Sequence, residues 1–315
     1  MSIRGAAKAM RAVAATTLVL ALSGCNVPNV AQQRSVEEAR SAQTAALSPK
    51  VESSSLVQAG YLTVGLRTNR AVVPMCIEVD DSVLGYDVDV ASALADELGL
   101  KVRFVPVTNV GKSLGSECDV VMDVSAEESG SSGKVVGSYA EAATAFFHRG
   151  DMGVANVEDL ASKSVGLQDG SVSQKALAAT SLAMTEKTFD NLNDAFVALS
   201  SGSIDYVLCD AYPGAYLACM SAGVHFVGTL DAPTSEGVAV ADANTKLQSE
   251  VRDALVSIQS DGRADVIRSR WVGGMPALSA NSQIKNVPQS AAAAATAQTS
   301  GGISTAGANA SAAPA

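Results

Sequence analysis

Short apolar runs alternate with amphipathic segments along the middle of the chain. The runs at 61–66, 102–107 and 119–124 are rich in β-branched residues and have the length of buried strands. Between the first two, apolar residues recur at helical spacing over 86–98, and Gly99 follows as a stop signal. Strands that alternate with helices in this way predict a parallel sheet with helices packed on its faces.

A second series of the same kind follows and extends the α/β pattern to about residue 271. We expect strands at 146–147, 164–168, 204–209 and 237–241, and helices at 157–161, 172–179, 191–199, 247–259 and 264–270. The folded part then spans roughly 220 residues, enough for one large domain or two ordinary ones.

The stretch 199–220 contains a buried strand that ends on a carboxylate. The run 204–208 is apolar, Asp210 ends it, and Pro213 sits where the first turn of a helix tolerates proline. In open α/β sheets a charged group at the carboxyl end of a strand faces a ligand cleft. The alternative is that Asp210 only caps the following helix, because Asp is a favoured N-cap residue.

Composition narrows the function classes. The 315 residues are 47% hydrophobic and only 4% aromatic, and the formal net charge is −10. This balance disfavours nucleic acid and anionic lipid surfaces as partners. The two histidines, His148 and His225, are isolated in the sequence, and no His/Cys/Asp/Glu group has the spacing of a metal site. We expect no metal and no cofactor.

The amino terminus resembles a bacterial lipoprotein signal. Residues 1–11 are basic, 12–22 are apolar but too short to span a bilayer, and Leu22-Ser23-Gly24-Cys25 follows. The resemblance implies a signal peptide at 1–24, cleavage before Cys25, acylation of its thiol (palmitate) and an extracytoplasmic protein anchored to the cell membrane. The alternative is an ordinary secretory signal with a chance cysteine.

Two polar, low-complexity segments flank the predicted fold. Residues 25–55 are rich in Ser, Ala, Gln and Glu without a sustained apolar period, which predicts a flexible tether. Residues 279–315 are largely Ala, Ser, Thr, Gly, Asn and Gln, which predicts a disordered tail.

A set of short motifs in fixed order covers nearly all of the folded part. They are Gly60-Tyr61-Leu62-Thr63-Val64-Gly65, Leu84-Gly85-Tyr86-Asp87-Val88-Asp89-Val90, Asp119-Val120-Val121, Val165-Gly166-Leu167-Gln168-Asp169-Gly170-Ser171, Ala198-Leu199-Ser200-Ser201-Gly202, Asp210, Asp261-Gly262 and Trp271-Val272-Gly273. In this order and spacing the chain resembles the family 3 extracellular solute-binding proteins, the amino-acid receptors of ABC importers.

That resemblance implies a type II periplasmic-binding-protein fold, with two lobes joined by two hinge crossovers that close on a solute. Lobe one would comprise 56–144 and 236–275, lobe two would comprise 145–235, and the crossovers would fall near Ala145 and Thr234. Such a protein binds a small polar solute, an amino acid or amine, as a monomer and delivers it to permease subunits. It is not an enzyme.

The resemblance also implies site residues. Asp210 matches the acid that pairs with a ligand ammonium in relatives. Gly170-Ser171 matches the turn that meets the ligand carboxylate. The next residue is usually Thr but is Val172 here, and we expect Ser173 to compensate. Tyr86 and Tyr139 match positions near the cleft mouth, where packing is an equal alternative.

The carboxylate half of the site departs from the family pattern. Relatives usually carry a Thr and an Arg shortly after the third strand, whereas this chain reads Ser125-Ala126-Glu127-Glu128-Ser129-Gly130. Arg67 and Arg70, just past the first strand, are candidate replacements, and we hypothesise that Arg70 supplies the missing cation. The alternative is a solvated loop arginine. A free α-amino acid as ligand is therefore in doubt.

Four cysteines remain besides Cys25, an even number for an oxidising compartment. Because a bridge between lobes would lock the hinge, the lobe assignment favours Cys76 with Cys118 and Cys209 with Cys219. Four separate thiols are the alternative.

Two other function classes stay open. One is an enzyme on the same fold, dehydratase-like, for which Glu127, Glu128 or Glu141 would be the acid or base. The other is a signalling or scaffold lipoprotein that has lost transport.

Overall fold

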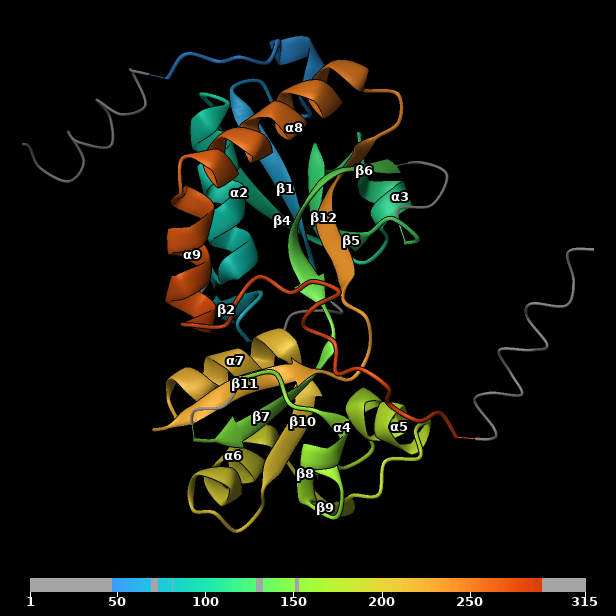
Figure 1. The fold of residues 1–315 in the computed structure, drawn as a ribbon. Coiled ribbons are helices and arrows are strands. Elements are labelled where there is room, and N and C mark those ends of the chain that lie inside the picture. Colours follow the sequence, from blue (N-terminus) through green and yellow to red (C-terminus); the bar gives the residue numbers. More distant parts are fainter. Residues whose placement is uncertain (1–46, 69–72, 81, 129–132, 151–152, 291–315) are drawn as a thin grey trace, which may run out of the picture. The chain divides into compact units, whose positions relative to one another are not determined.

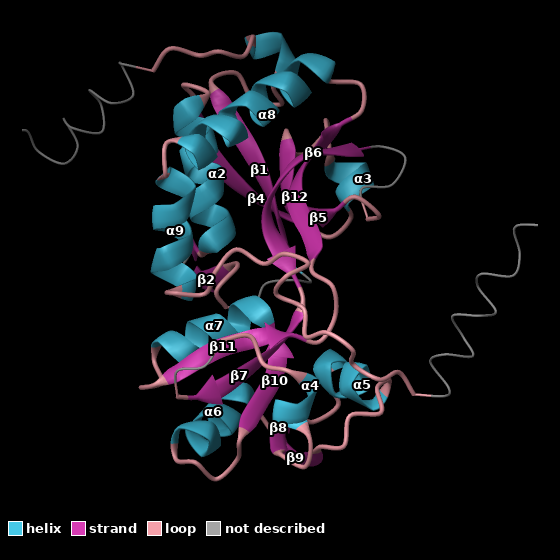
Figure 2. Cartoon of the chain, viewed as in Figure 1, coloured by secondary structure: helices cyan, strands magenta, loops and turns pink. Residues whose placement is uncertain are grey.

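The computed structural model describes residues 47–68, 73–80, 82–128, 133–150 and 153–290. The signal peptide, Cys25, Arg70 and the end of the tail therefore lie outside the described residues. Within the described residues, no helix is both long enough and apolar enough to cross a membrane. The described part contains two five-stranded sheets, each with its own helices (Figures 1 and 2).

The first sheet has the strand order β4-β1-β5-β12-β6, and we call it, with its helices, lobe one. The strands are β1 (Tyr61–Arg67), β4 (Lys101–Val107), β5 (Val120–Ser125), β6 (Gly133–Ala142) and β12 (Thr234–Ala241). Strand β1 runs parallel to β4 and β5, whereas β12 is antiparallel to β5 and β6. The helices are α2 (Tyr86–Glu97), α3 (Val110–Ser113), α8 (Thr245–Ser260) and α9 (Arg263–Val272), and a small hairpin joins β2 (Ile77–Val79) to β3 (Ser82–Leu84).

Both faces of the first sheet are covered, which is why its strands read as continuous apolar runs. Leu62, Val64 and Leu66 of β1 belong to the same core cluster as apolar residues of α2 and α8. On the opposite face, an added Cβ at Gly65 would meet Val107 and Val121 of a second cluster. Because successive side chains of β1 point to opposite faces of the sheet, this one strand contributes to two core clusters.

The second sheet has the strand order β11-β7-β10-β8-β9, and we call it, with its helices, lobe two. The strands are β7 (Thr144–Arg149), β8 (Ser164–Gln168), β9 (Thr185–Phe189), β10 (Tyr206–Asp210) and β11 (Val224–Thr229). The helices are α4 (Val157–Leu160), α5 (Val172–Ala178), α6 (Leu192–Ser200) and α7 (Ala211–Cys219). The strands and helices expected in 61–271 all occur, while β6, β9, β11, the small hairpin and the short helix α3 were not expected.

The chain passes between the sheets at Ala143 and again at residues 230–233. Thr144 already belongs to β7, and Thr234 already belongs to β12. The lobe boundaries therefore lie one or two residues away from those expected. Asp231 ties the two passages together, because its carboxylate accepts a hydrogen bond from the Thr144 N–H at 2.7 Å and its carbonyl accepts one from the Thr229 hydroxyl at 2.7 Å.

Residues 279–290 are not part of a disordered tail, which corrects the compositional prediction. Ile284 is 1% exposed in the lobe-two core, and its N–H donates to the Thr229 carbonyl at 2.9 Å. Further along, Ser181 donates its N–H to the Pro288 carbonyl. Composition misses this segment because two buried side chains, Ser282 and Ile284, and backbone pairing hold it without an apolar period.

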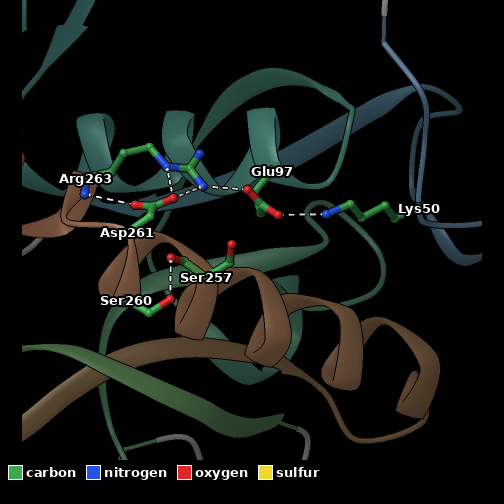
Figure 3. Close-up of polar contacts among 6 residues, drawn as sticks. All are labelled: Lys50, Glu97, Ser257, Ser260, Asp261 and Arg263. Carbon is green, nitrogen blue, oxygen red and sulfur yellow. Dashed lines mark hydrogen bonds and ion pairs between the residues drawn. The ribbon is translucent and has the colours of Figure 1, made fainter.

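The end of the predicted tether is likewise held on lobe one. Val51 is buried in the core, and the Lys50 N–H donates to the Leu98 carbonyl at 3.0 Å. The Lys50 ammonium pairs with Glu97, which also pairs with Arg263 (Figure 3). Residues 47–55 therefore belong to the fold, and the prediction of a flexible tether is wrong for them.

The cysteines also differ from expectation. Cys76, Cys118, Cys209 and Cys219 are all free thiols in the structure, so neither expected bridge is present. Cys76 and Cys118 belong to different core clusters on lobe one. Burial raises the pKa of Cys76 to about 11 and that of Cys118 to about 12, so both thiols are protonated at neutral pH.

Candidate functional site

A cavity of about 550 Å³ lies where the two lobes face each other. Its described lining comes from Met75 and strands β5, β6 and β12 of lobe one, from β7, β10, α5 and α7 of lobe two, and from the two passages between them. Among these lining residues, five carry carboxylates and none is Lys, Arg or His. The five acids are Asp123, Glu141, Asp210, Asp231 and Glu236, and we call this hollow the acidic cavity.

Asp210 reaches the acidic cavity from the junction of β10 and α7. It stands at the N-cap position of α7, yet its side chain makes no capping hydrogen bond. Asp210 itself is exposed at the end of β10, whereas the four preceding residues of this strand are buried. Asp210 therefore occupies the N-cap position of α7 without capping the helix through its side chain.

Asp123 reaches the cavity because β5 bulges there. Val121 and Val124 pair with Ala239 and Gly237, so two residues of β5 stand opposite one residue of β12. Asp123 has a φ of 56°, a conformation that Asp tolerates better than most residues. Its N–H donates to the Tyr139 hydroxyl and its carbonyl accepts from Arg67, both at 2.9 Å.

Glu141 and Glu236 come from the neighbouring strands β6 and β12. Glu236 is 4% exposed and lies beside Ala140 in the sheet register. Burial raises the pKa of Glu141, partly offset by a backbone hydrogen bond from Leu278 and by the charge of Arg268. Lobe one therefore supplies three carboxylates to one side of the cavity.

Tyr212 of α7 adds a hydroxyl to the lining. The residue is 5% exposed, and its ring packs against Tyr86 with centroids 5.4 Å apart. The Tyr86 hydroxyl and the Glu141 backbone lie near the Tyr212 hydroxyl, but among the described residues none forms a hydrogen bond of normal geometry with it. Burial raises the pKa of Tyr212, so the hydroxyl is neutral at physiological pH.

The described lining does not form a metal centre. No group of three or more His, Cys, Asp or Glu side chains in the described part of the chain is arranged to hold a metal ion. The acids instead stand on both sides of the cavity, on separate strands and passages.

Comparison with known proteins decides the family. Residues 62–274, more than half of the chain, match the model of the bacterial extracellular solute-binding proteins, family 3. The chain belongs to this family. An arginine-binding periplasmic protein of Mannheimia haemolytica is 26% identical over 207 residues, which cover 62% of this chain and 85% of that protein.

Solved structures agree with the fold. An ancestral cationic amino acid solute-binding protein is 26% identical, with a TM-score of 0.55, and the match covers 68% of this chain and 96% of that one. A substrate-binding protein of a polar amino acid ABC uptake transporter from Streptococcus thermophilus has a TM-score of 0.63 at 19% identity, covering 73% and 91%. The resemblance identified in the sequence is thus confirmed, as is the two-lobed α/β fold.

For this solute-binding protein, Asp210 is the expected site residue that lines the acidic cavity. The other described candidates do not line it; they are Arg67, Tyr86, Ser125, Gly170, Ser171 and Ser173. Arg70 lies outside the described residues. Each of the non-lining candidates has a local role that the structure makes visible.

The Gly170–Ser171 turn is closed by the protein itself. The Gly170 N–H donates to the Gln174 side-chain oxygen at 2.9 Å, and the Ser171 hydroxyl oxygen accepts from the Gln174 N–H at 3.1 Å. Ser173 is buried, whereas Val172 is 72% exposed and lines the cavity. Ser173 is therefore not part of the cavity lining, and its role in place of the usual threonine stays a prediction.

Arg67, Ser125 and Tyr86 are engaged within lobe one. The Arg67 guanidinium pairs with Glu128 at 2.8 Å, and its side chain is only 10% exposed. Ser125 accepts a hydrogen bond from the Glu128 N–H. Tyr86 is 1% exposed and donates its hydroxyl to the Tyr139 carbonyl at 2.8 Å, so it acts in packing.

Sequence reasoning missed Asp123, Asp231 and Glu236 as site residues, and it considered Glu141 only as a catalytic group. Asp123 lies inside the strand predicted at 119–124, and Glu141 lies in β6, a strand that was not predicted. Glu236 lies just before the strand predicted at 237–241. For Asp123 the sequence contains one signal, an acid inside the apolar run Val120-Val121-Met122-Asp123-Val124. Such a charge is seldom buried unless it serves a function.

Proposed function

We propose that the protein is the lipid-anchored, extracytoplasmic binding component of an ABC importer. It captures an amine-bearing polar solute, an amino acid or a relative of one, by closure of its two lobes, and presents it to permease subunits. It works as a monomer without metal or cofactor and catalyses no reaction. The family and the relatives, which are named as binding proteins, support this proposal.

One observation carries the choice of solute. Asp210, at the carboxyl end of β10, lines a cavity that both lobes contribute to, and the described lining holds carboxylates without a basic side chain. A ligand ammonium that enters this cavity gains charge-assisted hydrogen bonds, which are roughly twice as strong as neutral ones.

Ligand-induced stabilisation tests the proposal. A binder raises the free energy of unfolding by mass action, by about 2.7 kcal/mol at a ligand concentration of 100 times the Kd. We expect a rise in Tm with at least one member of a panel of amino acids, small peptides and amines. If no member of the panel, at millimolar concentration, raises the Tm, the proposal of a solute-binding role is refuted.

The lipid anchor needs its own test, since Cys25 lies outside the described residues. We expect acyl label on the wild-type chain, accumulation of the unprocessed precursor with globomycin, and loss of label in Cys25→Ser. Processing that resists globomycin, or a labelled Cys25→Ser variant, would point to an ordinary secretory signal. This result would leave the binding role unaffected.

A further inference from the structure

A third passage between the lobes follows α9. In the described part of the chain, residues 273–290 begin at the end of α9 on lobe one and finish on lobe two, and we call this segment the strap (Figure 1). The family resemblance implies two hinge crossovers, near Ala145 and Thr234, and composition predicts disorder for most of the strap. The strap is therefore a connection between the lobes that neither pattern predicts.

The first part of the strap is fixed on lobe one. The Met275 carbonyl accepts a hydrogen bond from the Arg268 guanidinium of α9 at 2.9 Å. The side chains of Met275 and Leu278 are buried in the core cluster that includes α2 and α8. The backbone of Leu278 also forms a hydrogen bond with Glu141 of β6. These contacts make residues 275–278 move with lobe one.

The second part of the strap is fixed on lobe two. Thr229, the last residue of β11, donates its N–H to the Ser282 carbonyl at 2.8 Å and accepts a hydrogen bond from the Ile284 N–H at 2.9 Å. Ser282 and Ile284 are buried, and Ile284 belongs to the lobe-two core. Further along, Ser290 donates its N–H to the Ala179 carbonyl. Residues 282–290 therefore move with lobe two.

The link between the two fixed parts is short. Only residues 279–281 separate Leu278 from Ser282, and even a fully extended chain would span at most about 14 Å between them. In the structure this link is folded into a turn, because Ser282 donates its N–H to the Ser279 carbonyl at 2.8 Å and its hydroxyl accepts from the Ser279 N–H at 3.1 Å. The strap can lengthen only by unfolding this turn.

The strap also contacts lobe two away from the other two passages. Those passages meet α7 at its start, where the Ala211 N–H donates to the Ala143 carbonyl at 2.9 Å. Cys219, at the other end of α7, lies against Gly273, since a Cβ added to this glycine would come within 2.5 Å of the Cys219 sulfur. The length of α7 separates these two points by about 12 Å. Because lobes rotate about the passages that join them, a connection this far from the passages restricts the rotation.

We propose that the strap limits how far the two lobes rotate apart, so that the protein without ligand keeps a narrow range of inter-lobe distances. Rotation beyond the reach of the extended link would pull Ser282 and Ile284 from Thr229, or Leu278 from Glu141. A narrow range of unliganded conformations reduces the conformational entropy that is lost when a solute is captured. The proposed function requires only that the lobes close, and this restriction goes beyond it.

A longer strap tests this inference. Four residues, Gly-Ser-Gly-Ser, are inserted after the exposed Ala280, which lengthens the link and keeps the contacts of Leu278 and Ile284. The matched control carries the same insertion after Ser290, beyond the last described contact of the strap. Because both insertions lie in exposed backbone, we expect both variants to fold.

Single-molecule energy transfer measures the inter-lobe distance in the mature chain without ligand. The dyes are attached through Asp190→Cys on lobe two and Asp253→Cys on α8, both exposed positions. Cys25→Ser and Cys219→Ser remove the lipidation site and the exposed thiol, and the other three cysteines are buried. We expect the insertion after Ala280 to at least double the width of the distance distribution, and the control insertion to leave it unchanged. Equal widths for the two insertions would overturn the inference.

A second pair of variants decides the test if the insertion after Ala280 abolishes the unfolding transition. Gly228 has a φ of 135°, and an added Cβ would lie 2.8 Å from the Cγ1 atom of Ile284, so Gly228→Ala displaces the strap from β11. The control is Gly223→Ala just before β11, where φ is also positive, at 72°, but an added Cβ meets nothing within 4 Å. We expect Gly228→Ala alone to broaden the distribution, and equal widths would overturn the inference.

These measurements need no ligand, so their outcome is independent of the proposed solute-binding function. Equal widths would remove the restriction by the strap and leave that function in place. A ligand panel without any binder would refute the function and leave the distance distributions as measured.

Discussion

Lobe one presents Asp123 and Glu236 from interior strands of its sheet, whereas lobe two presents Asp210 where a strand ends and a helix begins. In lobe one the backbone around Asp123 is held on both sides, by the Tyr139 hydroxyl and by Arg67. In lobe two the carboxylate stands at an exposed strand end, and the core behind it is completed by residues 279–290.

The two lobes thus hold their carboxylates in position by different means. A rigid acidic surface on lobe one needs buried polar groups to hold its charges in position, and such networks are costly to break. Three substitutions test this difference between the lobes.

The largest effect is expected from Ile284→Ala, which tests the core of lobe two. Ile284 is 1% exposed and packs against Gly228, where an added Cβ would meet its side chain. Truncation of a buried Ile costs about 2–5 kcal/mol of stability. We expect a loss of about 3 kcal/mol in urea unfolding followed by circular dichroism. Val266→Ala, at a position 70% exposed on α9, is the control. Equal midpoints for the two variants would remove residues 279–290 from the lobe-two core.

Tyr139→Phe tests the fixed surface of lobe one. The hydroxyl donates to the Asp87 carboxylate and accepts from the Asp123 N–H, and both contacts are buried. Leaving a buried polar group without its partner costs about 1–3 kcal/mol. We expect a loss of about 2 kcal/mol by urea unfolding. Tyr61→Phe, the same chemical change at the partly exposed start of β1, should be close to neutral. Equal stability of the two variants would contradict the inference that the Tyr139 hydroxyl fixes the bulge of β5.

The smallest effect concerns the far end of lobe one, where Glu97 joins Lys50 and Arg263 (Figure 3). These partners lower the pKa of Glu97 from 4.5 to about 2. A lowered pKa in the folded state means that the stabilisation is present above about pH 4.5 and is lost as the pH falls toward 2. Because Lys50 is half exposed, we expect only about 1 kcal/mol from the cluster.

Glu97→Gln should therefore reduce stability by about 1 kcal/mol at pH 7 and by almost nothing at pH 2. Urea unfolding at several pH values measures this difference. Asp253→Asn, which removes an exposed acid on the neighbouring helix α8, is the control for a general loss of negative charge. A difference between wild type and Glu97→Gln that stays constant from pH 7 to pH 2 would contradict the ion-pair origin.

The sequence by itself predicts the two strand-helix series, the family and Asp210 at a strand end. These features depend on local periodicity and on motifs in fixed order, which neighbouring residues carry. The match of 62–274 to the family model and the two observed sheets confirm that part.

Which charged groups share the cavity depends on contacts between residues far apart in the sequence. Asp123 and Glu236 meet through a bulge and the register of β5 against β12, and no local pattern encodes that pairing. Arg67 is turned to Glu128, 61 residues away, and Gln174 closes the turn that the family pattern assigns to a ligand. Val51 and Ile284 are buried in the cores although they lie inside polar segments, where composition predicts disorder. Long-range packing and hydrogen-bond partners, which the order of residues does not reveal, thus determine the chemistry of the site.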